Sequence, residues 1–570
     1  MNDFRDSKGF KTLTNNKGSA LIIALAIMTI LLLIGGAGLL RSNQETQISG
    51  NGVLVKKAFY AAEAGTEYGL SNLRGLLQNT LYPTINIPAP TMAGFVIEPA
   101  DFTVVKLNPT PVQMDINQGT YRGLQAFLTR YEIKSKARVD NSKTNASVGL
   151  LVDDQLIPIF QFGIFYYNDL EMIPGARMDY SGGRIHSNHD IYLQANGTTF
   201  NINAPITTAG NIINGQKDGT ARSTGTVQIM DGKSPPAYQT LNIDSRTADW
   251  ANLAINRWDY QVQTKDHDIF PITLPLPSSS TTIDIVKRGQ AGDPSLLRES
   301  RLYWKAGLRI LDGVAYDKNG NVVDLRYSDG TQMVNPLSSR TMYDYREGKT
   351  MQLTEVDIAA LTDPRCPGLA KINDPPSGGD PGIFYISKTP SVNPAEINAV
   401  RLVNGSVIPA SGLTVATDNP LYIKGNYNTA NSPAAVAADA VTVLSNNWNS
   451  SSDSTYSYEN NLSHRVANNS MVNAALLTGN RESASGGQYS GGIENFIRFL
   501  ENWTGKAFTY KGSLVCLWQS EQVTGNWRYG SPVYTAPNRV WSYGIDPAHL
   551  PPGTPRVRYM QRIQWYQTLN

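Results

Sequence analysis

Residues 19–40 read SALIIALAIMTILLLIGGAGLL, and no charged side chain interrupts them. A helix rises about 1.5 Å per residue, so residues 20–40 reach roughly 31 Å, which matches the hydrocarbon core of a bilayer. A secretory signal peptide has a shorter apolar core of about 7 to 15 residues, with cleavage on its far side. The stretch therefore predicts a helix that crosses a membrane.

A short basic leader precedes this helix. Residues 1–18 carry more basic than acidic side chains: Arg5, Lys8, Lys11 and Lys17 against Asp3 and Asp6. Basic flanks stay on the cytoplasmic side, so everything after Leu40 is expected to be exported. From hydropathy alone, a generic signal anchor is the favoured interpretation.

The residues after the apolar run favour continued helix. Gly50-Asn51 is followed by KAFYAAEAG at residues 57–65, and the stretch contains strong helix formers and no proline. Pro83 and the prolines after it forbid a continuing helix, so the stalk is expected to end within Leu70–Leu77. One long helix, half membrane span and half stalk, is predicted.

The Lys-Gly junction, the apolar helix, Gly50-Asn51 and AFYAAEAG together resemble the N-terminal domain of PilX-type type IV pilins over residues 17–75. The resemblance implies cleavage by prepilin peptidase between Gly18 and Ser19, with Ser19 methylated as the mature N-terminus. It also implies a subunit anchored in the inner membrane that later packs among minor and major pilins. The motif carried over for this helix comprises Gly50, Asn51, Ala61, Ala62 and Glu63.

One position departs from the usual pilin pattern. Most pilins carry a glutamate five residues into the mature chain, where it neutralises a neighbour's N-terminal amine, and this chain has Ile23 there. PilX-like proteins commonly lack the acid, as does the K-type pseudopilin that caps type II secretion pseudopili. The departure favours a rare, tip-proximal or initiating subunit over a major pilin.

Composition bounds the exported part. Only 17% of residues are charged, while the chain has 49 Gly, 32 Pro and 28 Tyr, a mixture typical of extracellular β-rich proteins. A formal net charge of +2 gives no basis for a nucleic-acid partner. Residues 125–139 alternate apolar and charged side chains, which predicts a half-buried strand, with residues 102–107 and 147–153 as its neighbours in a small antiparallel sheet.

Short β-rich triplets separated by Gly, Asn or Pro begin near Phe160 and return after Ala399. Strands this short are stable when they stack as turns of a solenoid, so we predict a right-handed parallel β-helix interrupted by an insertion. An ordinary β-sandwich is the alternative. The predicted fold class is α+β, mainly β: a long N-terminal pilin helix, a small antiparallel sheet and a large β-rich body.

The expected organisation follows. The predicted regions are a leader (1–18), a membrane and stalk helix (19–75), a small β-sheet region (76–158), a β-helix-like body (159–230 and 385–480), an insertion (231–384) and a C-terminal capping region (481–570). Within them we expect a hairpin turning at Asn319-Gly320, a short helix over Met351–Leu361 with Thr354 as N-cap, and a capping helix over Gly492–Trp503.

Candidate chemical groups are few. His186, His189 and Asp190 offer metal ligands, but along a strand the two imidazoles point to opposite faces. Asp317–Asp324 resembles the opening of a calcium loop yet lacks the distal glutamate, so an Asn-Gly turn is expected. Cys366 and Cys516 either pair after export or stay separate thiols. We predict no metal site and no cofactor.

Aromatic residues are frequent after residue 440, and exposed ones would suit a carbohydrate ligand, although most are expected in the core. No clustered carboxylates, nucleophile motif or phosphate loop indicates an enzyme. The predicted function is a minor type IV pilin serving pilus assembly, adhesion or motility. The alternatives are a pseudopilus tip subunit and an anchored surface protein that never enters a filament.

Overall fold

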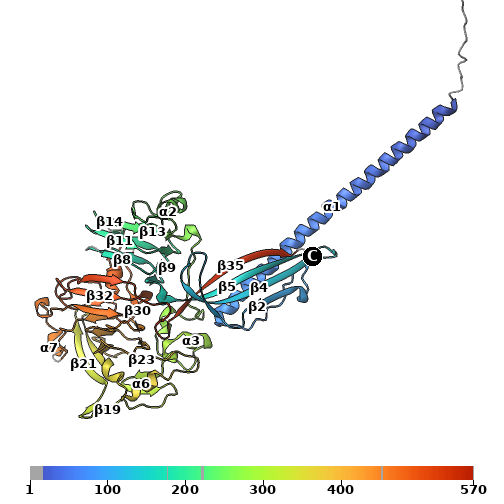
Figure 1. Cartoon of the computed structure of the whole chain (residues 1–570). Coiled ribbons are helices and arrows are strands. Elements are labelled where there is room, and N and C mark those ends of the chain that lie inside the picture. Colours follow the sequence, from blue (N-terminus) through green and yellow to red (C-terminus); the bar gives the residue numbers. More distant parts are fainter. Residues whose placement is uncertain (1–16, 176–177, 220–223, 451–452, 485, 569–570) are drawn as a thin grey trace, which may run out of the picture.

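The computed structural model describes residues 17–175, 178–219, 224–450, 453–484 and 486–568 (Figure 1). Helix α1, Lys17–Asn79, extends from the rest of the molecule as a long rod. It ends just past the predicted Leu70–Leu77 and before Pro83, whose ring cannot continue a helix. Of the predicted leader, only Lys17 and Gly18 lie inside the described residues.

The lower half of α1 packs on an antiparallel sheet. The sheet has the order β1-β4-β5-β35, with β2 and β3 also pairing along β4. The strands are β1 (Phe95–Val96), β2 (Phe102–Lys106), β3 (Val112–Asp115), β4 (Gln125–Val139), β5 (Asn145–Pro158) and β35 (Arg556–Thr568). β4 has the predicted bounds, because its period of two places Tyr131, Ile133 and Ala137 in the core beneath α1.

Two glycines set the distance between α1 and β4. A Cβ atom at Gly65 would lie 2.1 Å from Ser135 Oγ, and one at Gly69 would lie 2.7 Å from Ile133 Cγ2. Real Cβ contacts are longer than this, so any larger residue would push the helix away. The glycines therefore let the backbone of the helix lie directly against the strand.

The last strand belongs to this sheet and not to a cap. β35 pairs antiparallel with β5 from Arg556↔Pro158 to Thr568↔Ser147, with an irregularity between Arg562 and Gln564. The predicted capping region, 481–570, thus contains a strand that returns beside α1. β5 would otherwise leave a row of backbone groups unpaired, and β35 satisfies them. The body, residues 159–555, is inserted between two neighbouring strands of one sheet.

The body is built from stacks of short strands. The largest sheet has 11 strands, and all its neighbours pair in parallel except the terminal pair β17 and β18. In spatial order they are β16 (Val262–Gln263), β12 (Ile206–Thr208), β9 (Ile185–Ser187), β6 (Ile164–Tyr166), β33 (Leu514–Gln519), β30 (Ala475–Asn480), β27 (Ala434–Ala438), β25 (Leu413–Ala416), β23 (Ile383–Ser387), β17 (Leu308–Leu311) and β18 (Val314–Asp317).

Smaller sheets complete the body. One has the order β13 (Ile212–Asn214), β10 (Ile191–Leu193), β7 (Leu170–Met172), and another β15 (Tyr238–Thr240), β14 (Thr226–Met230), β11 (Thr199–Asn203), β8 (Met178–Ser181). A third has β21 (Leu337–Asp344), β22 (Lys349–Asp357), β24 (Glu396–Val403), β26 (Leu421–Lys424), β28 (Val441–Leu444), β31 (Ile497–Phe499). A fourth has β29 (Ser470–Asn473), β32 (Ala507–Lys511), β34 (Asn538–Ser542), and β19 (Tyr327–Ser328) pairs with β20 (Met333–Val334).

The chain passes through the 11-stranded sheet in two runs that meet in the middle. The first run begins at β6, in the middle of the sheet, and continues through β9 and β12 to one end. Residues 264–307 then lead to the opposite end, where β17 begins the second run, which ends at β33. β33 then pairs in parallel with β6, joining the two runs at Val515↔Phe165. Inward residues stack along the whole ladder: Phe384, Val415, Val436, Leu476, Leu514, Ile164, Ile185, Ile206 and Val262.

The segment between the two runs is not a separate insertion. β17, β18, β21 and β22 lie within the predicted insertion, 231–384, yet extend the stacks. Short helices occur along this part of the chain: α2 (Trp250–Trp258), α3 (Ser295–Ser300), α4 (Leu302–Lys305), α5 (Ile358–Leu361), α6 (Pro367–Ile372), and later α7 (Asp453–Tyr456). Residues 272–306 contribute Ile272, Ile285 and Leu302 to a core on the outer side of the 11-stranded sheet.

Two predicted helices are not present as helices: the first segment is mostly strand, and the second is a short 3-10 turn followed by a strand. Met351–Leu361 forms most of β22 and only then the one-turn α5, whose N-cap is Asp357 and not Thr354. Gly492–Trp503 forms a 3-10 turn, Gly492–Asn495, followed by β31. Both segments pair in parallel with neighbours, β22 with β24 and β31 with β28, and this pairing overrides the helical spacing of their apolar residues.

The mainly β fold with one long helix is confirmed. The predicted triplets after Phe160 are strands. They pair in parallel, whereas the strands of a β-sandwich pair antiparallel. The hand of the winding and the β-helix assignment stay predictions. The Asn319-Gly320 turn is present, and the N–H of Gly320 donates to the backbone carbonyl oxygen of Asp317. The β17–β18 hairpin, however, turns earlier in the chain, at Asp312-Gly313.

Candidate assembly helix

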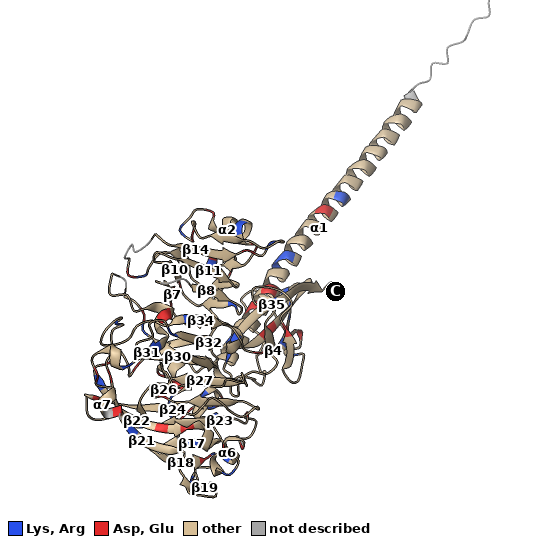
Figure 2. Ribbon diagram, turned by 60° about the vertical axis from the view of Figure 1, so that its left-hand side comes forward, with Lys and Arg blue, Asp and Glu red and all other residues tan. Residues whose placement is uncertain are grey.

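The N-terminal half of α1 exposes apolar side chains all round. Leu21, Ile23 and Leu32 are 66%, 58% and 75% exposed. By length and composition the helix is able to cross a membrane. Figure 2 shows this part of α1 free of blue and red, with charge beginning farther along the rod. Burying such side chains is worth about 25 cal/mol per Å², so water is an unfavourable environment for this surface.

The predicted processing pair lies at the start of the helix. Gly18 and Ser19 are exposed in the first turn of α1, and no acidic residue occurs there. Ile23 lies in the next turn, where its side chain is apolar and exposed. The described start of the helix therefore has no carboxylate for a neighbouring amine.

The glycines of the upper helix contact nothing in the chain. A Cβ atom at Gly35, Gly36 or Gly38 would meet no atom within 4 Å, and the same holds at Gly50. Asn51 is also exposed. These glycines therefore leave the helix backbone uncovered, and such small residues let membrane helices approach closely.

The second part of the predicted motif has a different role in the fold. Ala61 and Ala62 are buried in the core between α1 and the sheet, and Glu63 is half-buried. Tyr60, by contrast, is 65% exposed. The structure therefore separates the motif: Gly50 and Asn51 lie on the free rod, whereas Ala61 and Ala62 dock the rod on its own sheet.

β35 also holds α1 on the sheet, although the sequence predicts residues 481–570 as a capping region. Arg558 donates to the carbonyl oxygens of Leu77 and Leu81 at the end of α1, and Trp565 packs edge-on against Phe59 with ring centroids 5.6 Å apart. The alternation in RVRYMQRIQWYQT, residues 556–568, was the available signal for a strand. The sequence pattern did not indicate that β5 is the partner of this strand.

Arg558 also holds a buried carboxylate below the helix. Its Nε lies 2.9 Å from Asp154 Oδ1. Burial raises the pKa of Asp154 to about 6, and the charge of Arg558 opposes that rise. The pair links β35 to β5 beneath the end of α1.

The histidine candidates do not converge. His186 is buried, with Nδ1 2.9 Å from Thr207 Oγ1 and Nε2 3.0 Å from Asn188 Oδ1, while His189 is exposed. Burial lowers the pKa of His186 to about 3, so the ring is neutral. Throughout the described ranges, no three His, Cys, Asp or Glu side chains gather as a metal site.

The remaining candidates are structural. Cys366 and Cys516 are buried free thiols, and burial raises the pKa of both. Asp317 accepts hydrogen bonds from the backbone N–H groups of Asn319 and Asn321, and these bonds hold the turn that contains Asn319-Gly320. Most late aromatic residues are core residues, among them Trp448, Trp503, Trp518 and Trp541.

Comparison with known proteins places the N-terminal region. The PilX N-terminal family model matches residues 17–67. No curated protein matches the sequence significantly. Among solved structures, the competence-associated pilin ComZ from Thermus thermophilus aligns at 12% identity and a TM-score of 0.27, over 91% of this chain and 98% of that chain. The family match shows that residues 17–67 are similar to the N-terminal region of PilX proteins.

Proposed function

We propose that the chain is a minor type IV pilin, tip-proximal or initiating, which carries a large β-rich body out of the cell. In this proposal prepilin peptidase cleaves after Gly18, and Ser19 becomes the methylated N-terminus. The helix anchors the subunit in the inner membrane and then exchanges lipid for the helices of other pilins. Priming of assembly and contact with a surface or carbohydrate are the two roles of the body.

The observation that carries the proposal is the unpartnered apolar half of α1. Its large apolar side chains are exposed, whereas the lower half is fixed to the sheet through Ala61, Ala62 and Gly65. A rigid rod with one docked and one free half suits lateral packing of parallel subunits. The exposed apolar half alone would also suit a simple membrane anchor, and the similarity of residues 17–67 to the PilX N-terminal region is what favours a filament subunit.

Two further observations support a tip or initiating position. Ile23 offers no carboxylate to the N-terminal amine of a subunit added beside it. The body, residues 159–555, lies at the end of the molecule away from the N-terminus of α1 (Figure 1). Such a bulk at every position would crowd a shaft of identical copies.

The absence of the acid also suits the tip subunit of a type II secretion-like pseudopilus. Filament counts and secretion assays in a strain lacking the gene separate the two systems. The proposal includes no catalytic role, because a pilin N-terminal region is that of a structural component.

Processing is tested first. Gly18→Val should retain the leader, while wild type begins at Ser19 by mass spectrometry. Gly75→Val is the matched control, since a Cβ atom there also meets nothing within 4 Å. An intact leader on the wild-type protein would exclude the pilin route.

The role of the body requires a deletion that keeps β35. Because Pro158 and Arg556 face each other across β5 and β35, an Asn-Gly turn can join them and leave the sheet complete. Truncation after Pro158 is the control, as it removes the body and β35 together. If the joined variant is processed but forms few filaments, the body acts in assembly. Normal filaments that no longer attach would assign it to contact, and normal filaments with normal attachment would reject both roles.

A further inference from the structure

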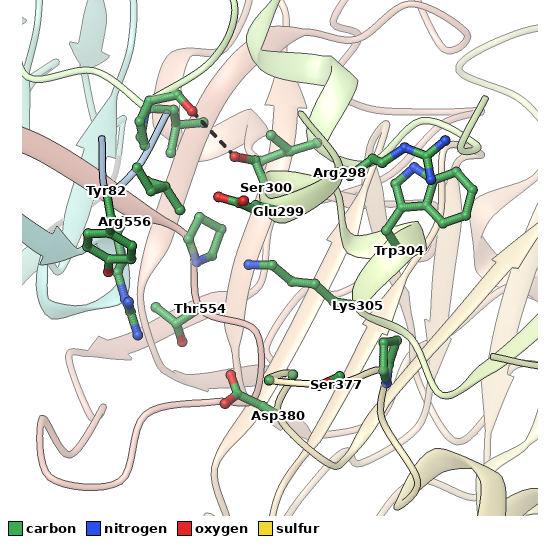
Figure 3. A pocket seen from close by; sticks show the side chains of 18 residues that line it. Tyr82, Arg298, Glu299, Ser300, Trp304, Lys305, Ser377, Asp380, Thr554 and Arg556 are labelled. Carbon is green, nitrogen blue, oxygen red and sulfur yellow. Dashed lines mark hydrogen bonds between the residues drawn. The ribbon is translucent and has the colours of Figure 1, made fainter. Parts of the chain in front are cut away.

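A pocket of about 540 Å³ opens where the body meets the sheet that carries α1. α3 and α4 contribute Glu299 and Lys305 to it, the loop before β23 contributes Asp380, and β35 contributes Arg556 at its first residue. Figure 3 shows the side chain of Lys305 reaching into the pocket, with Arg556 and Thr554 on the opposite side. The volume lies within the range of small-molecule sites.

Two cations in this pocket have charged groups that make no hydrogen bond or ion pair with another described residue. Among the described residues, Lys305 Nζ makes no hydrogen bond or ion pair, and the guanidinium of Arg556 stacks on the Phe127 ring, 3.8 Å from its centroid, without an ion pair. Arg298, a third cation, differs because its guanidinium donates to the carbonyl oxygens of Ala291 and Asp293. Lys305 and Arg556 are thus the cations available to a ligand.

The two carboxylates nearby are placed at the flanks. Asp380 Oδ2 accepts the N–H of Gly553 at 2.8 Å, and Glu299 is exposed at the rim. Neither is within ion-pair distance of Lys305 or Arg556 in the described structure. Burial and the charge of Arg556 lower the pKa of Lys305 to about 8, against the opposing effect of Asp380 and Glu299. Burial and the neighbouring charge of Arg556 therefore both disfavour the protonated ammonium group of Lys305.

We propose that this pocket binds a monoanionic, hydroxyl-bearing carboxylate, such as a uronic acid or another sugar acid, with its carboxylate group between Lys305 and Arg556. An oxyanion there removes the repulsion between the two cations and receives charge-assisted hydrogen bonds from both. Glu299 and Asp380 repel a dianion, which favours a carboxylate over a phosphate monoester. They also accept hydrogen bonds from ligand hydroxyl groups, as does Thr554 Oγ1, whose own proton goes to Pro551 O at 2.6 Å.

This inference deepens one proposed role of the body, contact with a carbohydrate, by naming the class of ligand, and it holds whether or not the chain enters a filament. The pocket lies beside the first residues of β35, so it belongs to the joint between the body and the docked rod. Its test is a binding measurement on the purified protein. Failure of that test leaves processing and filament formation untouched.

Calorimetric titration of the full chain in non-ionic detergent tests the proposal. Glucuronate should bind, while glucose, which lacks the carboxylate, should not, and inorganic phosphate should bind at least tenfold more weakly than glucuronate. Lys305→Gln and Arg556→Gln should each weaken glucuronate binding at least tenfold. Lys143→Gln is the matched control, because it removes the same charge from an exposed turn of the sheet.

Two further arms sharpen the result. Raising the pH from 7 to 9.5 should weaken binding to wild type, as Lys305 loses its proton, but not to Lys305→Gln. Binding of an oligogalacturonate at least as tight as that of the monomer would identify the ligand as a unit of an acidic glycan, and preference for the monomer would identify a free sugar acid. No binding at millimolar glucuronate, equal binding of glucose, or an unchanged affinity in folded Lys305→Gln would overturn the proposal.

Discussion

The guanidinium group of Arg562 donates two hydrogen bonds to the carboxylate of Glu67, Nη1 to Oε1 and Nη2 to Oε2, each 2.8 Å long. Glu67 lies in the lower half of α1 and Arg562 in β35, so the pair joins the first helix to the last strand. Together with Trp565 against Phe59, it shows that the rod is held by residues at the C-terminus. The body between them is an insertion in this small unit.

Breaking that pair should have a small, salt-sensitive effect. The side chains are 52% and 47% exposed, so a double-mutant cycle of Arg562→Gln and Glu67→Gln should give a coupling energy of about 0.5–1 kcal/mol. Urea unfolding in detergent measures it, and 0.5 M salt should reduce it. A coupling of zero at low salt would contradict the bidentate contact.

Gly65→Ala should destabilise the protein even though alanine favours helix. The new methyl group would lie 2.1 Å from Ser135 Oγ, and such overpacking costs about 1–3 kcal/mol. Gly75→Ala is the control in the same helix, where nothing lies within 4 Å, and it should stabilise by up to about 1 kcal/mol. Thermal unfolding of both variants gives the comparison. Equal melting temperatures would mean that α1 does not lie this close to β4.

Removing Arg401 should unfold the body. Its guanidinium is fully buried, 2.5 Å from Glu355 and 2.6 Å from Asp453. Arg401→Met removes this buried cation from both carboxylates, so that Glu355 keeps only Ser338 and the more distant Arg340, and Asp453 keeps Trp448. We expect a loss of about 3–5 kcal/mol. Arg340→Met removes a half-exposed partner of the same Glu355, 3.7 Å away, and should cost less than about 1 kcal/mol. Similar losses in the two variants would argue against a buried triad.

Stability should fall between acidic and neutral pH through Glu501. Burial raises the pKa of Glu501 from 4.5 to about 7, against hydrogen bonds from Ser445. Between those values the folded state holds a proton that the unfolded state has lost. The stabilising contribution is therefore complete below about pH 4.5 and is lost as the pH rises to 7, a change of about 3 kcal/mol.

Glu501→Gln tests this assignment, because an amide does not titrate. The free energy of unfolding at pH 5 and pH 8 should differ less in the variant than in wild type by about that amount. Identical pH profiles for the two proteins would show that Glu501 ionises in the folded state as it does in water.

Local patterns in the sequence predicted the rod and several strands. Three signals were local in the sequence: the apolar run of residues 20–40, the prolines after the helix and the period of two in β4. A single sequence contains such information, because each signal involves only residues that are close along the chain. The triplets after Phe160 were likewise readable as strands, since Gly and Asn turns mark their ends. The same reading failed at Gly492–Trp503, where helical spacing gave way to parallel pairing.

By itself, the sequence determined that a long apolar helix leads into a β-rich chain, because length, charge and hydropathy act locally. Only the tertiary structure decided that Arg556–Thr568 returns to β5, that Val515 pairs with Phe165, and that Lys305 and Arg556 meet in one pocket. Each of these pairings joins residues hundreds of positions apart. Backbone hydrogen bonding and burial select such partners from the whole molecule, and no spacing within the sequence records that choice.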